Sequence, residues 1–387
     1  MRDLKIAVVG GGIGGLTAAL SLGQAGYDVS LYERAPEITP IGAGISLWPN
    51  GVKVMQWLGV GEELAALAPP MRRLRYLAPD GEQLTDISLA PLESAAGQRA
   101  YPIARTDIQL TLLRHLGDER VTLDATCVGA DQDDDGVTVR FADGREVRAD
   151  VLVGADGVRS ALREQVIGEP WPPRYAGNVN WNGLVPADEA IGPLDAFTLI
   201  VGEGRRCGFM PVSEGRFYFF FDAAMPADSV VERGGWRAEL EQLFRGWGSN
   251  VHALLDGLDE ERMVRHPIHD LEPLPRFADR RIALLGDAAH AATPMLGQGA
   301  AMAMEDAVVL TRCLVTTDMG IAHALERYES QRSDRAHAIA RASRERTELM
   351  IASDPVATER WYAQLRGAED GDVIDAMTRI VVAGPFG

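Results

Sequence analysis

The sequence has few cysteines and no long apolar run. Its three cysteines, Cys127, Cys207 and Cys313, are spread over 387 residues, and none belongs to a CxxC pair or a cysteine and histidine cluster with metal-ligand spacing. This predicts reduced thiols in a cytoplasmic protein without a metal site. The apolar start, Ile6 to Val9, is too short and too soon interrupted by glycine for a signal peptide or membrane span, so we expect no membrane association.

Positive charge is scarce too. The chain carries 38 lysines and arginines against 56 aspartates and glutamates, a formal net charge of -18 at pH 7. Such a surface repels polyphosphate, which excludes nucleic-acid binding through a general basic face. An anionic ligand must be met by individual arginines. The hydrophobic fraction of 46% is ordinary, and the length favours two domains. We expect a monomer or a homodimer whose partners are small molecules.

The N-terminal stretch carries the most informative motif. The β-branched run Ile6 to Val9 predicts a buried strand, and the glycines after it fit G-x-G-x-x-G at the start of a helix. A second strand, 27–32, ends in an acid 18 residues beyond the last glycine, where this fold binds a ribose. This order predicts a dinucleotide with its pyrophosphate at a helix N-terminus, and leaves both FAD and NAD open. The residues expected to contact it are Gly10, Gly12, Gly14, Gly15, Glu33 and Arg34.

Two later predicted strands are each followed by an aspartate next to a glycine. Residues 149–154 lead into Asp156-Gly157, and residues 281–285 lead into Gly286-Asp287. Because ligands of a doubly wound sheet lie off the carboxyl ends of its strands, both aspartates are candidate contacts.

Two predicted helices begin beside further candidates. Residues 297–299 open a helix over 300–315, whose first amides can face a carbonyl or a developing anion. Arg105 precedes another helix, with Thr106 or Asp107 as its cap. It is either a surface charge or a contact to a phosphate or flavin edge.

The rest of the chain divides into predicted strands and helices. A turn at residues 79–81 predicts a hairpin of 74–77 and 83–89, and three short runs predict a meander of 121–123, 137–141 and 146–148. An antiparallel sheet is expected from 178–185, 196–201, 207–211 and 216–222, and the poor alternation of its last strand favours cover on both faces. Residues 236–255 read as helical, and the chain after 300 as helices with a charged surface.

Taken together, the glycine motif with Glu33, the Asp156 stretch, and Gly286-Asp287 with Pro294-x-x-Gly297-Gln298-Gly299 resemble the single-component flavin aromatic hydroxylases of the para-hydroxybenzoate hydroxylase type. The resemblance covers nearly the whole chain and implies FAD, a reduced nicotinamide and molecular oxygen. It implies an α/β fold: a Rossmann-like FAD-binding domain with C-terminal helices over 1–72, 98–172 and 271–387, and an inserted mixed or antiparallel substrate sheet over 73–97 and 173–270. The FAD contacts implied beyond the first motif are Arg105, Asp156, Asp287, Gly297, Gln298 and Gly299.

A narrower resemblance is to the bacterial FAD-dependent urate hydroxylases. It is carried by residues 45–51 (ISLWPNG), 179–184 (VNWNGL), 201–204 (VGEG), 210–213 (MPVS) and 215–221 (GRFYFFF). It implies oxidation of urate to 5-hydroxyisourate in purine metabolism, through a flavin C4a-hydroperoxide, with NADH as reductant and NADPH as the alternative. Arg206 and Tyr218 are the catalytic residues it implies. The substrate-binding set is Asn180, Arg206, Tyr218, Met295 and Gly297.

Two positions depart from the pattern that the resemblance implies. Met295 stands where the urate enzymes are expected to carry an acid after the Thr-Pro pair, and Ala301 replaces an asparagine common in the wider family. Two other functions therefore stay open. One is hydroxylation of another aromatic substrate, such as a phenolic acid like salicylate, and the other is NADH oxidation by a flavoprotein that does not hydroxylate.

Overall fold

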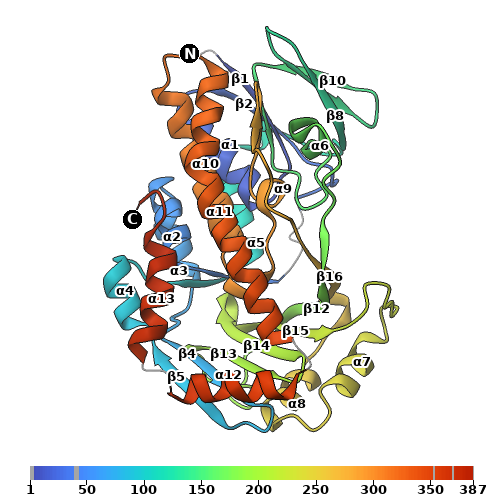
Figure 1. Cartoon of the computed structure of the whole chain (residues 1–387), viewed down its shortest axis with the longest axis vertical. Helices are drawn as coiled ribbons and strands as arrows, with labels where there is room; N and C mark the ends of the chain where they lie inside the picture. The colour runs from blue at the N-terminus through green and yellow to red at the C-terminus, as the bar shows by residue number, and fades with distance from the viewer. Residues whose placement is uncertain (1–3, 39–42, 352–353, 368–369, 387) are drawn as a thin grey trace.

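The N-terminal motif forms the centre of a six-stranded sheet. The structure is a computed structural model that describes residues 4–38, 43–351, 354–367 and 370–386. Strand β1 (Lys5–Val9) lies between β11 (Val151–Gly154) and β2 (Asp28–Tyr32), is parallel to both, and is buried from Ile6 to Val9. The order is β17-β18-β11-β1-β2-β7, completed by β17 (Ala278–Asp279), β18 (Ile282–Leu284) and β7 (Val121–Thr122). This sheet, at the upper end in Figure 1, confirms the predicted Rossmann-like α/β fold.

Two glycines bring the ends of β1 and β11 together. Gly10 has φ +109°, and a Cβ atom added there would lie 2.2 Å from the Ala155 carbonyl oxygen. A Cβ atom on Gly15, in helix α1 (Ile13–Gln24), would lie 1.8 Å from the Gly10 carbonyl oxygen. Both positions therefore exclude any larger residue, as the motif requires.

A seven-stranded sheet lies at the other end of the molecule. Its order is β16-β12-β15-β14-β13-β4-β5, and all neighbours are antiparallel except β13 and β4. The strands are β4 (Arg73–Leu77), β5 (Gln83–Ser88), β12 (Arg174–Pro186), β13 (Ala196–Gly202), β14 (Arg205–Val212), β15 (Arg216–Ala224) and β16 (Val264–Asp270). The hairpin of β4 and β5 is confirmed, and it joins the sheet built from residues 174–270. The domain boundaries given above stay a prediction.

Strand β15 is packed on both faces, as its poor alternation predicted. Phe217, Phe219 and Phe221 lie in one apolar cluster with helices α7 (Trp236–Leu243) and α8 (Ser249–Asp256). Tyr218 and Phe220 point to the opposite face, where they pack against a different cluster. The helical region predicted over 236–255 is thus two helices, separated by a segment that contains Gly246 with φ +81°.

One strand of the predicted meander belongs elsewhere. Val121 and Thr122 pair in parallel with Leu31 and Tyr32, so this segment extends the six-stranded sheet. The meander is instead β8 (Cys127–Gln132), β9 (Val137–Phe141) and β10 (Glu146–Ala149). The prediction was wrong because short apolar runs give no information on which sheet they join.

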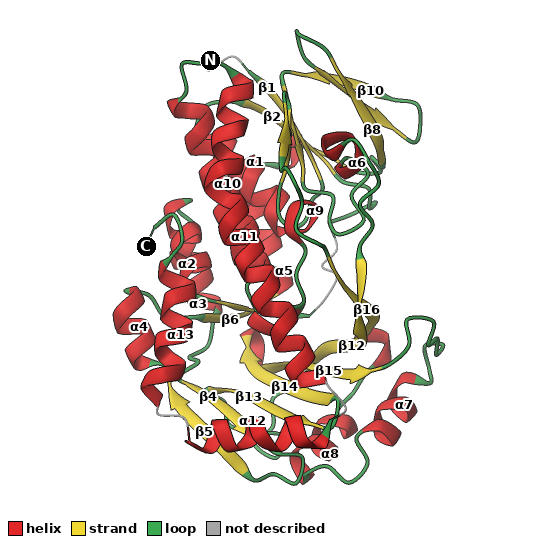
Figure 2. Cartoon of the chain, in the orientation of Figure 1, coloured by secondary structure: helices red, strands yellow, loops and turns green. Residues whose placement is uncertain are grey.

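Helices cover both sheets and connect them (Figure 2). The longest, α11 (Ile321–Ile351), runs beside α10 (Gly299–Thr316) from the first sheet to the second (Figure 1). The remaining helices are α2 (Pro49–Trp57), α3 (Gly61–Leu67), α4 (Ala90–Ala96), α5 (Arg105–Leu116), α6 (Arg163–Ile167), α9 (Asp287–His290), α12 (Pro355–Gly367) and α13 (Asp370–Val382). A small ladder of β3 (Gly44–Leu47) and β6 (Tyr101–Ala104) lies between the two sheets, where β6 is labelled in Figure 2. Within the described ranges, no helix is both long and apolar enough to cross a membrane.

Helices α10 and α11 are joined by a buried ion network, defined by Glu305, Asp306, Arg332 and Arg335. Arg332 donates from Nη1 to Glu305 at 2.8 Å and from Nε to Asp306 at 2.6 Å. Arg335 binds Glu305 through two nitrogens, each at 2.8 Å. The two carboxylates are fully buried and Arg332 is 2% exposed. The charged surface predicted for the late helices does not include Arg332, which is buried because two carboxylates compensate its charge.

The network keeps both carboxylates ionised. Burial alone would raise the pKa of Glu305 and of Asp306, but the surrounding cations and hydrogen-bond donors outweigh it, and both values lie below the ordinary range. A carboxyl with a lower pKa in the folded state adds stability above its unfolded pKa, and this is lost as pH falls through the folded value. The network should therefore weaken only in acid, below about pH 4.

Replacing Arg332 with methionine should strongly destabilise the protein. The substitution leaves Asp306 and Glu305 buried without one of their cations, a loss that costs about 3 to 5 kcal/mol in the free energy of unfolding. Urea unfolding followed by circular dichroism at pH 7 measures it. Arg341→Met is the matched control, because Arg341 is exposed on the same helix and makes no ion pair with any described residue, and it should cost less than about 0.5 kcal/mol. Equal losses in the two variants would contradict a stabilising role for the network.

Candidate functional site

Three loops meet at one edge of the six-stranded sheet. They follow the neighbouring strands β1, β11 and β18, whose parallel directions place their carboxyl ends together. The loops carry the first glycines of the motif, Asp156, and Gly286-Asp287 respectively. In a parallel α/β sheet this edge is where ligands bind. The fold thus brings together the three stretches that the sequence singled out.

The first loop leaves room for a phosphate at the start of α1. A Cβ atom added to Gly12 would have no heavy atom within 4 Å, whereas one on Gly14 would lie 2.9 Å from both Ala303 Cβ and Leu285 Cδ2. Gly14 thus faces the packed interior next to α10, and Gly12 faces open space. The described structure gives α1 no side-chain cap, so its first amides are free to bind an anion.

Glu33 directly follows β2 and is tied to the glycine loop. Its Oε2 accepts a hydrogen bond from Gly11 N at 2.5 Å, and its Oε1 accepts one from Ala35 N at 2.9 Å. Each carboxylate oxygen keeps a second lone pair, so the acid can still accept a bond from a ribose hydroxyl. Arg34 beside it is exposed.

Asp156 organises the second loop. Its Oδ2 accepts a hydrogen bond from Ala161 N at 2.8 Å, while its Oδ1 is buried and has no partner among the described residues. Burial raises the pKa of this carboxyl. A buried acceptor without a donor is unusual in a folded protein, and a ligand hydroxyl or amide would satisfy it.

Arg163 connects the second loop to the third. Its guanidinium donates to the carbonyl oxygens of Val158 and Ala288, each at 2.9 Å, and it is 3% exposed. Burial lowers the pKa of this arginine, while Asp156 and Asp287 oppose that effect. No carboxylate in the described part of the chain is hydrogen-bonded to it. A buried cation therefore lies between two loops that face the ligand edge, where it favours an anionic ligand.

Arg105 is the first residue of α5, which therefore begins two or three positions earlier than the predicted cap at Thr106 or Asp107 implies. Neither Thr106 nor Asp107 caps the helix, because the chain becomes helical directly after Ala104 and the Asp107 carboxylate instead accepts a bond from Ser213 Oγ at 2.5 Å. The cap prediction was wrong for this reason.

The Arg105 side chain is half-buried and makes no hydrogen bond within the described residues. Burial lowers its pKa, and the nearby Asp287 and Tyr218 act in the opposite direction. A guanidinium stays charged in proteins. Arg105 therefore offers an unpaired positive charge close to Asp287, which is exposed at the start of α9, and to Tyr218 of the second sheet.

The start of α10 is held by the ion network. Gln298 accepts a hydrogen bond from Asn50 Nδ2 at 2.9 Å, and the same amide donates to Glu305 at 2.7 Å. A Cβ atom on Gly299 would meet nothing within 4 Å, whereas one on Gly297, where φ is +62°, would lie 2.9 Å from Trp48 Nε1. The indole nitrogen is buried without a partner among the described residues.

These features fit FAD. The open space at Gly12 adjoins the helix end that would take a pyrophosphate, and the open space at Gly299 adjoins the helix end that would face the flavin ring. The orphaned Asp156 oxygen and the unpaired Arg105 cation each gain a partner if a dinucleotide lies along this edge. The residues that would hold it are Gly12, Glu33, Arg105, Asp156, Asp287, Gln298 and Gly299.

Arg206 and Tyr218 lie on neighbouring strands of the second sheet, on the same face. Arg206 is 3% exposed and donates from Nε to Asp222 Oδ2 at 2.7 Å. The Phe220 ring lies between the two predicted catalytic residues, 4.6 Å from the Arg206 guanidinium and 5.9 Å from the Tyr218 ring centroid. Arg205 points to the other face, where it binds the Leu243 carbonyl.

Tyr218 also connects the seven-stranded sheet to the small ladder of β3 and β6. A Cβ atom on Gly44, in β3, would lie 2.5 Å from Tyr218 Cγ, so the ring packs directly on that strand. The backbone nitrogen of Arg105 bonds the Ala43 carbonyl at 3.3 Å, beside the same glycine. Burial raises the pKa of Tyr218 well above its ordinary value, which keeps the phenol neutral and able to donate.

The other predicted substrate residues have well-defined neighbours. Asn180 donates to Asp222 at 3.0 Å and accepts from Asn182 at 2.8 Å. Met295 is 9% exposed in an apolar cluster that also contains Trp48 and Phe220. Met295 thus offers a thioether in an apolar setting, and Asn180 belongs to the polar group around Asp222.

Sequence reasoning overlooked three contributors to this arrangement. They are Asp222, which pairs with Arg206, Asn50, which links Gln298 to Glu305, and Arg163 as a link between loops. Asp222 carried a usable signal, because it shares strand parity with Tyr218 and Phe220 and is the one charged residue in the run 217–224. Asn50 lies within the motif of residues 45–51, but the contacts of Asn50 and Arg163 could not be predicted, since their partners are distant in sequence.

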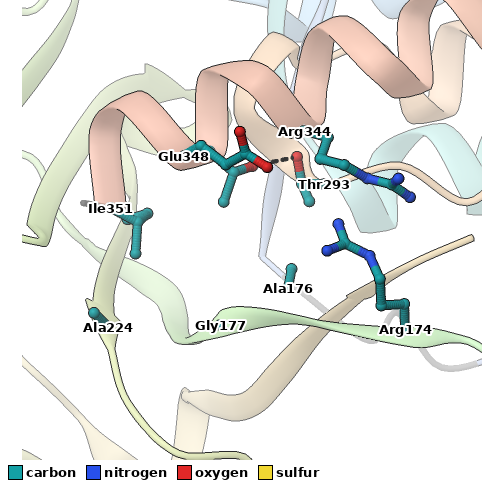
Figure 3. Close-up of a pocket in the computed structure, with 9 residues that line it drawn as sticks. Arg174, Ala176, Gly177, Ala224, Thr293, Arg344, Glu348 and Ile351 are labelled. Atoms are coloured by element: carbon teal, nitrogen blue, oxygen red, sulfur yellow. Dashed lines mark hydrogen bonds between the residues drawn. The ribbon is translucent and has the colours of Figure 1, made fainter.

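Two cavities lie next to the site without containing its predicted residues. One, of about 250 Å³, is bordered by Arg174, Thr293, Arg344 and Glu348 (Figure 3). Both arginines pair with the buried Asp270 and with Glu272, so the cavity holds no uncompensated positive charge from them. The other, of about 300 Å³, is lined by Ala43, Thr106, Asn182, Leu184, Val185, Pro186, Arg216, Arg262 and Val264. The geometry of the loops, rather than these cavities, marks the site.

Comparison with known proteins agrees with this geometry. The model of an FAD binding domain family matches residues 3–343. The FAD-dependent urate hydroxylase of Klebsiella pneumoniae subsp. pneumoniae is 45% identical over 385 residues, which cover 99% of this chain and 100% of that protein. The crystal structure of Klebsiella pneumoniae HpxO complexed with FAD and uric acid has a TM-score of 0.95 at 44% identity, covering 99% of this chain and 98% of that one. A salicylate hydroxylase substrate complex has a TM-score of 0.79 at 26% identity over 100% of both chains.

Sequence and fold agree over nearly the full length. The family model spans the glycine motif, the Asp156 and Asp287 loops and the start of α10, which are the parts of the structure that fit FAD. The chain therefore belongs to the FAD-dependent monooxygenases of the para-hydroxybenzoate hydroxylase type, in the branch that contains the FAD-dependent urate hydroxylases.

Proposed function

We propose that this enzyme hydroxylates urate to 5-hydroxyisourate with NADH and O2. The observation that carries the proposal is the buried Arg206, which keeps its terminal nitrogens free of carboxylates on a face shared with Tyr218. A guanidinium presents a rigid fork of donors that suits a planar anion with several acceptor atoms. Urate as that anion is supported by the 45% identical relative and by the HpxO complex with FAD and uric acid.

The proposed overall reaction balances as urate, NADH, O2 and one proton giving 5-hydroxyisourate, NAD+ and water. When bound, FAD carries two electrons from NADH to O2 and supplies one oxygen atom to the ring. The chain has no second dinucleotide glycine motif, so NADH is proposed to act without a Rossmann domain of its own.

The residues of the second sheet would hold the ring for this transfer. Arg206 would pair with the urate anion and Tyr218 would donate a hydrogen bond, which together fix the orientation of the ring. Phe220 between them and Met295 in the same apolar cluster would keep water out. A dry, oriented ring limits the competing loss of reducing equivalents to hydrogen peroxide.

Anaerobic mixing of the FAD-loaded enzyme with NADH tests the proposed function. Flavin bleaching is followed with and without urate, and the products are then analysed after oxygen is admitted. We expect urate to accelerate reduction and to be consumed in proportion to NADH. Consumption of salicylate but not urate would replace the substrate, and NADH oxidation that yields only hydrogen peroxide with every aromatic compound would remove the hydroxylase assignment.

Arg206→Gln should uncouple NADH oxidation from urate hydroxylation while FAD stays bound. Loss of a charge-assisted hydrogen bond costs about 1.5 to 3 kcal/mol, so kcat/KM for urate should fall about 10- to 150-fold. NADH consumption, urate loss and peroxide are measured together. Arg205→Gln, one residue away on the opposite face, is the matched control and should stay coupled. Equal coupling in Arg206→Gln and the parent would remove Arg206 from the site.

Tyr218→Phe should lower kcat/KM for urate about 2- to 12-fold. The substitution keeps the ring on Gly44 and removes one neutral hydrogen bond, worth about 0.5 to 1.5 kcal/mol. Because burial raises the Tyr218 pKa, the parent should show no loss of activity from phenol ionisation up to about pH 10. Tyr175→Phe is the control, since that hydroxyl donates to the Met225 carbonyl at 2.6 Å. A Tyr218→Phe variant with parental kcat/KM would show that the hydroxyl does not touch substrate.

A further inference from the structure

Asp222 is a buried carboxylate with three hydrogen-bond donors. It lies near the end of β15 and is fully buried. Its Oδ2 accepts from Arg206 Nε at 2.7 Å, and its Oδ1 accepts from the side-chain amides of Asn178 and Asn180, each at 3.0 Å. The strand register places Arg206 directly opposite Asp222, so the ion pair follows from the pairing of β14 with β15.

The two asparagines determine how Asp222 binds Arg206. A carboxylate with both oxygens free commonly takes a guanidinium through two parallel hydrogen bonds. Here the amides of Asn178 and Asn180 occupy Oδ1, and the arginine is held through Nε alone. Both asparagines are buried, at 0% and 5% exposed, so water does not replace them.

The rest of the Arg206 side chain is oriented by apolar contacts. Its guanidinium lies 4.6 Å from the Phe220 ring centroid, and Nη1 lies 3.9 Å from Met350 Sδ. Within the described residues, the two terminal nitrogens make no other hydrogen bond. Arg206 is therefore fixed at Nε while Nη1 and Nη2 keep donors for a ligand.

No acid approaches from the segment after Thr293-Pro294. Met295 occupies the position where the resemblance to the urate enzymes implies an acid, and it packs with Trp48 and Phe220 in an apolar cluster. The carboxylate that compensates Arg206 must therefore come from elsewhere, and Asp222 is the residue that the geometry supplies.

We propose that Asp222 is a positioning residue, which holds Arg206 by Nε so that its terminal nitrogens face an anionic substrate. The inference rests on the proposed function, because it assigns Asp222 to the same substrate site. Asp222 acts only through Arg206 and does not touch the substrate. Asn178 and Asn180 assist by keeping the second carboxylate oxygen away from the guanidinium.

Asp222→Asn in the FAD-loaded enzyme tests this inference. The amide has nearly the same shape but no charge, so Arg206 loses its fixed orientation. Because small displacements of a reacting group reduce rates steeply, we expect product formed per NADH to fall at least about threefold and kcat/KM for urate at least about tenfold. FAD content should be unchanged. Parental coupling in a folded, FAD-loaded Asp222→Asn variant would overturn the inference, because a merely structural carboxylate would change only thermal stability.

Asp270→Asn is the matched control. Asp270 is 1% exposed and pairs with Arg174 and Arg344. It lies on β16, which pairs with β12 in the same sheet. Its loss should lower the melting temperature while product per NADH stays within about 1.5-fold of the parent, since it does not contact Arg206. Equal uncoupling in both variants would show a general effect of removing a buried carboxylate, and would overturn the assignment to Asp222.

Asp222→Glu covers the case in which Asp222→Asn does not fold. It keeps the charge that compensates Arg206, but its extra methylene group moves the carboxylate, so product per NADH should fall about twofold or more. Full coupling in this variant would overturn the inference. If the parent enzyme does not convert urate, the proposed function has failed and the inference falls with it. If the parent converts urate and the Asp222 variants are coupled as well as the parent, only the inference is overturned.

Discussion

The pairing of Glu305 and Asp306 with Arg332 and Arg335 is the constraint on which most of this architecture depends. Glu305, Asp306 and Arg332 are buried between two helices and Arg335 is partly buried, which is favourable only if each buried charge keeps its partner and its hydrogen bonds. The requirement fixes how far α11 can slide or rotate along α10. Since α11 reaches from one sheet to the other, it also fixes the distance between them (Figure 1).

The same network extends to the loops of the cofactor site. Asp306 accepts from the backbone nitrogen of Gly286 at 2.9 Å and contacts His290 at 2.6 Å, so the loop that carries Asp287 is anchored from behind. Glu305 reaches Gln298 through Asn50. His290, in α9 after Asp287, is therefore a member of the buried hydrogen-bond network around Asp306.

The sequence predicts the parts of this structure that depend on neighbours along the chain. The glycine motif, the strand after it and the loops at Asp156 and Asp287 were identified correctly because each is a local pattern of strand, turn and helix. The strand at Val121 was assigned to the wrong sheet, and the burial of Arg332 was not predicted, because both depend on partners far away in sequence. Whether an arginine is buried is decided by the position of carboxylates on another helix, which hydrophobic spacing does not contain.

The candidate site shows the same division. Arg206 and Tyr218 could be named from motifs, but the state of Arg206 depends on Asp222, Asn178 and Asn180, which reach it through strand register. Alternation along β15 would have put Tyr218, Phe220 and Asp222 on one face. It would not have shown that two amides occupy one oxygen of Asp222. Because of those amides, Asp222 binds Arg206 through Nε alone, and the terminal nitrogens of Arg206 remain available as donors.

Charge accounting connects Met295 to the nature of the ligand. Arg206 is compensated by Asp222, while Arg105 makes no ion pair with any described residue and has Asp287 as a nearby carboxylate. An acid at position 295 would add a negative charge there and would compete with a bound anion for Arg206. With methionine there, the donors of Arg206 that Asp222 leaves free meet no carboxylate from this segment. Under the proposed function, the methionine leaves no residue at this position that could take a proton from the substrate.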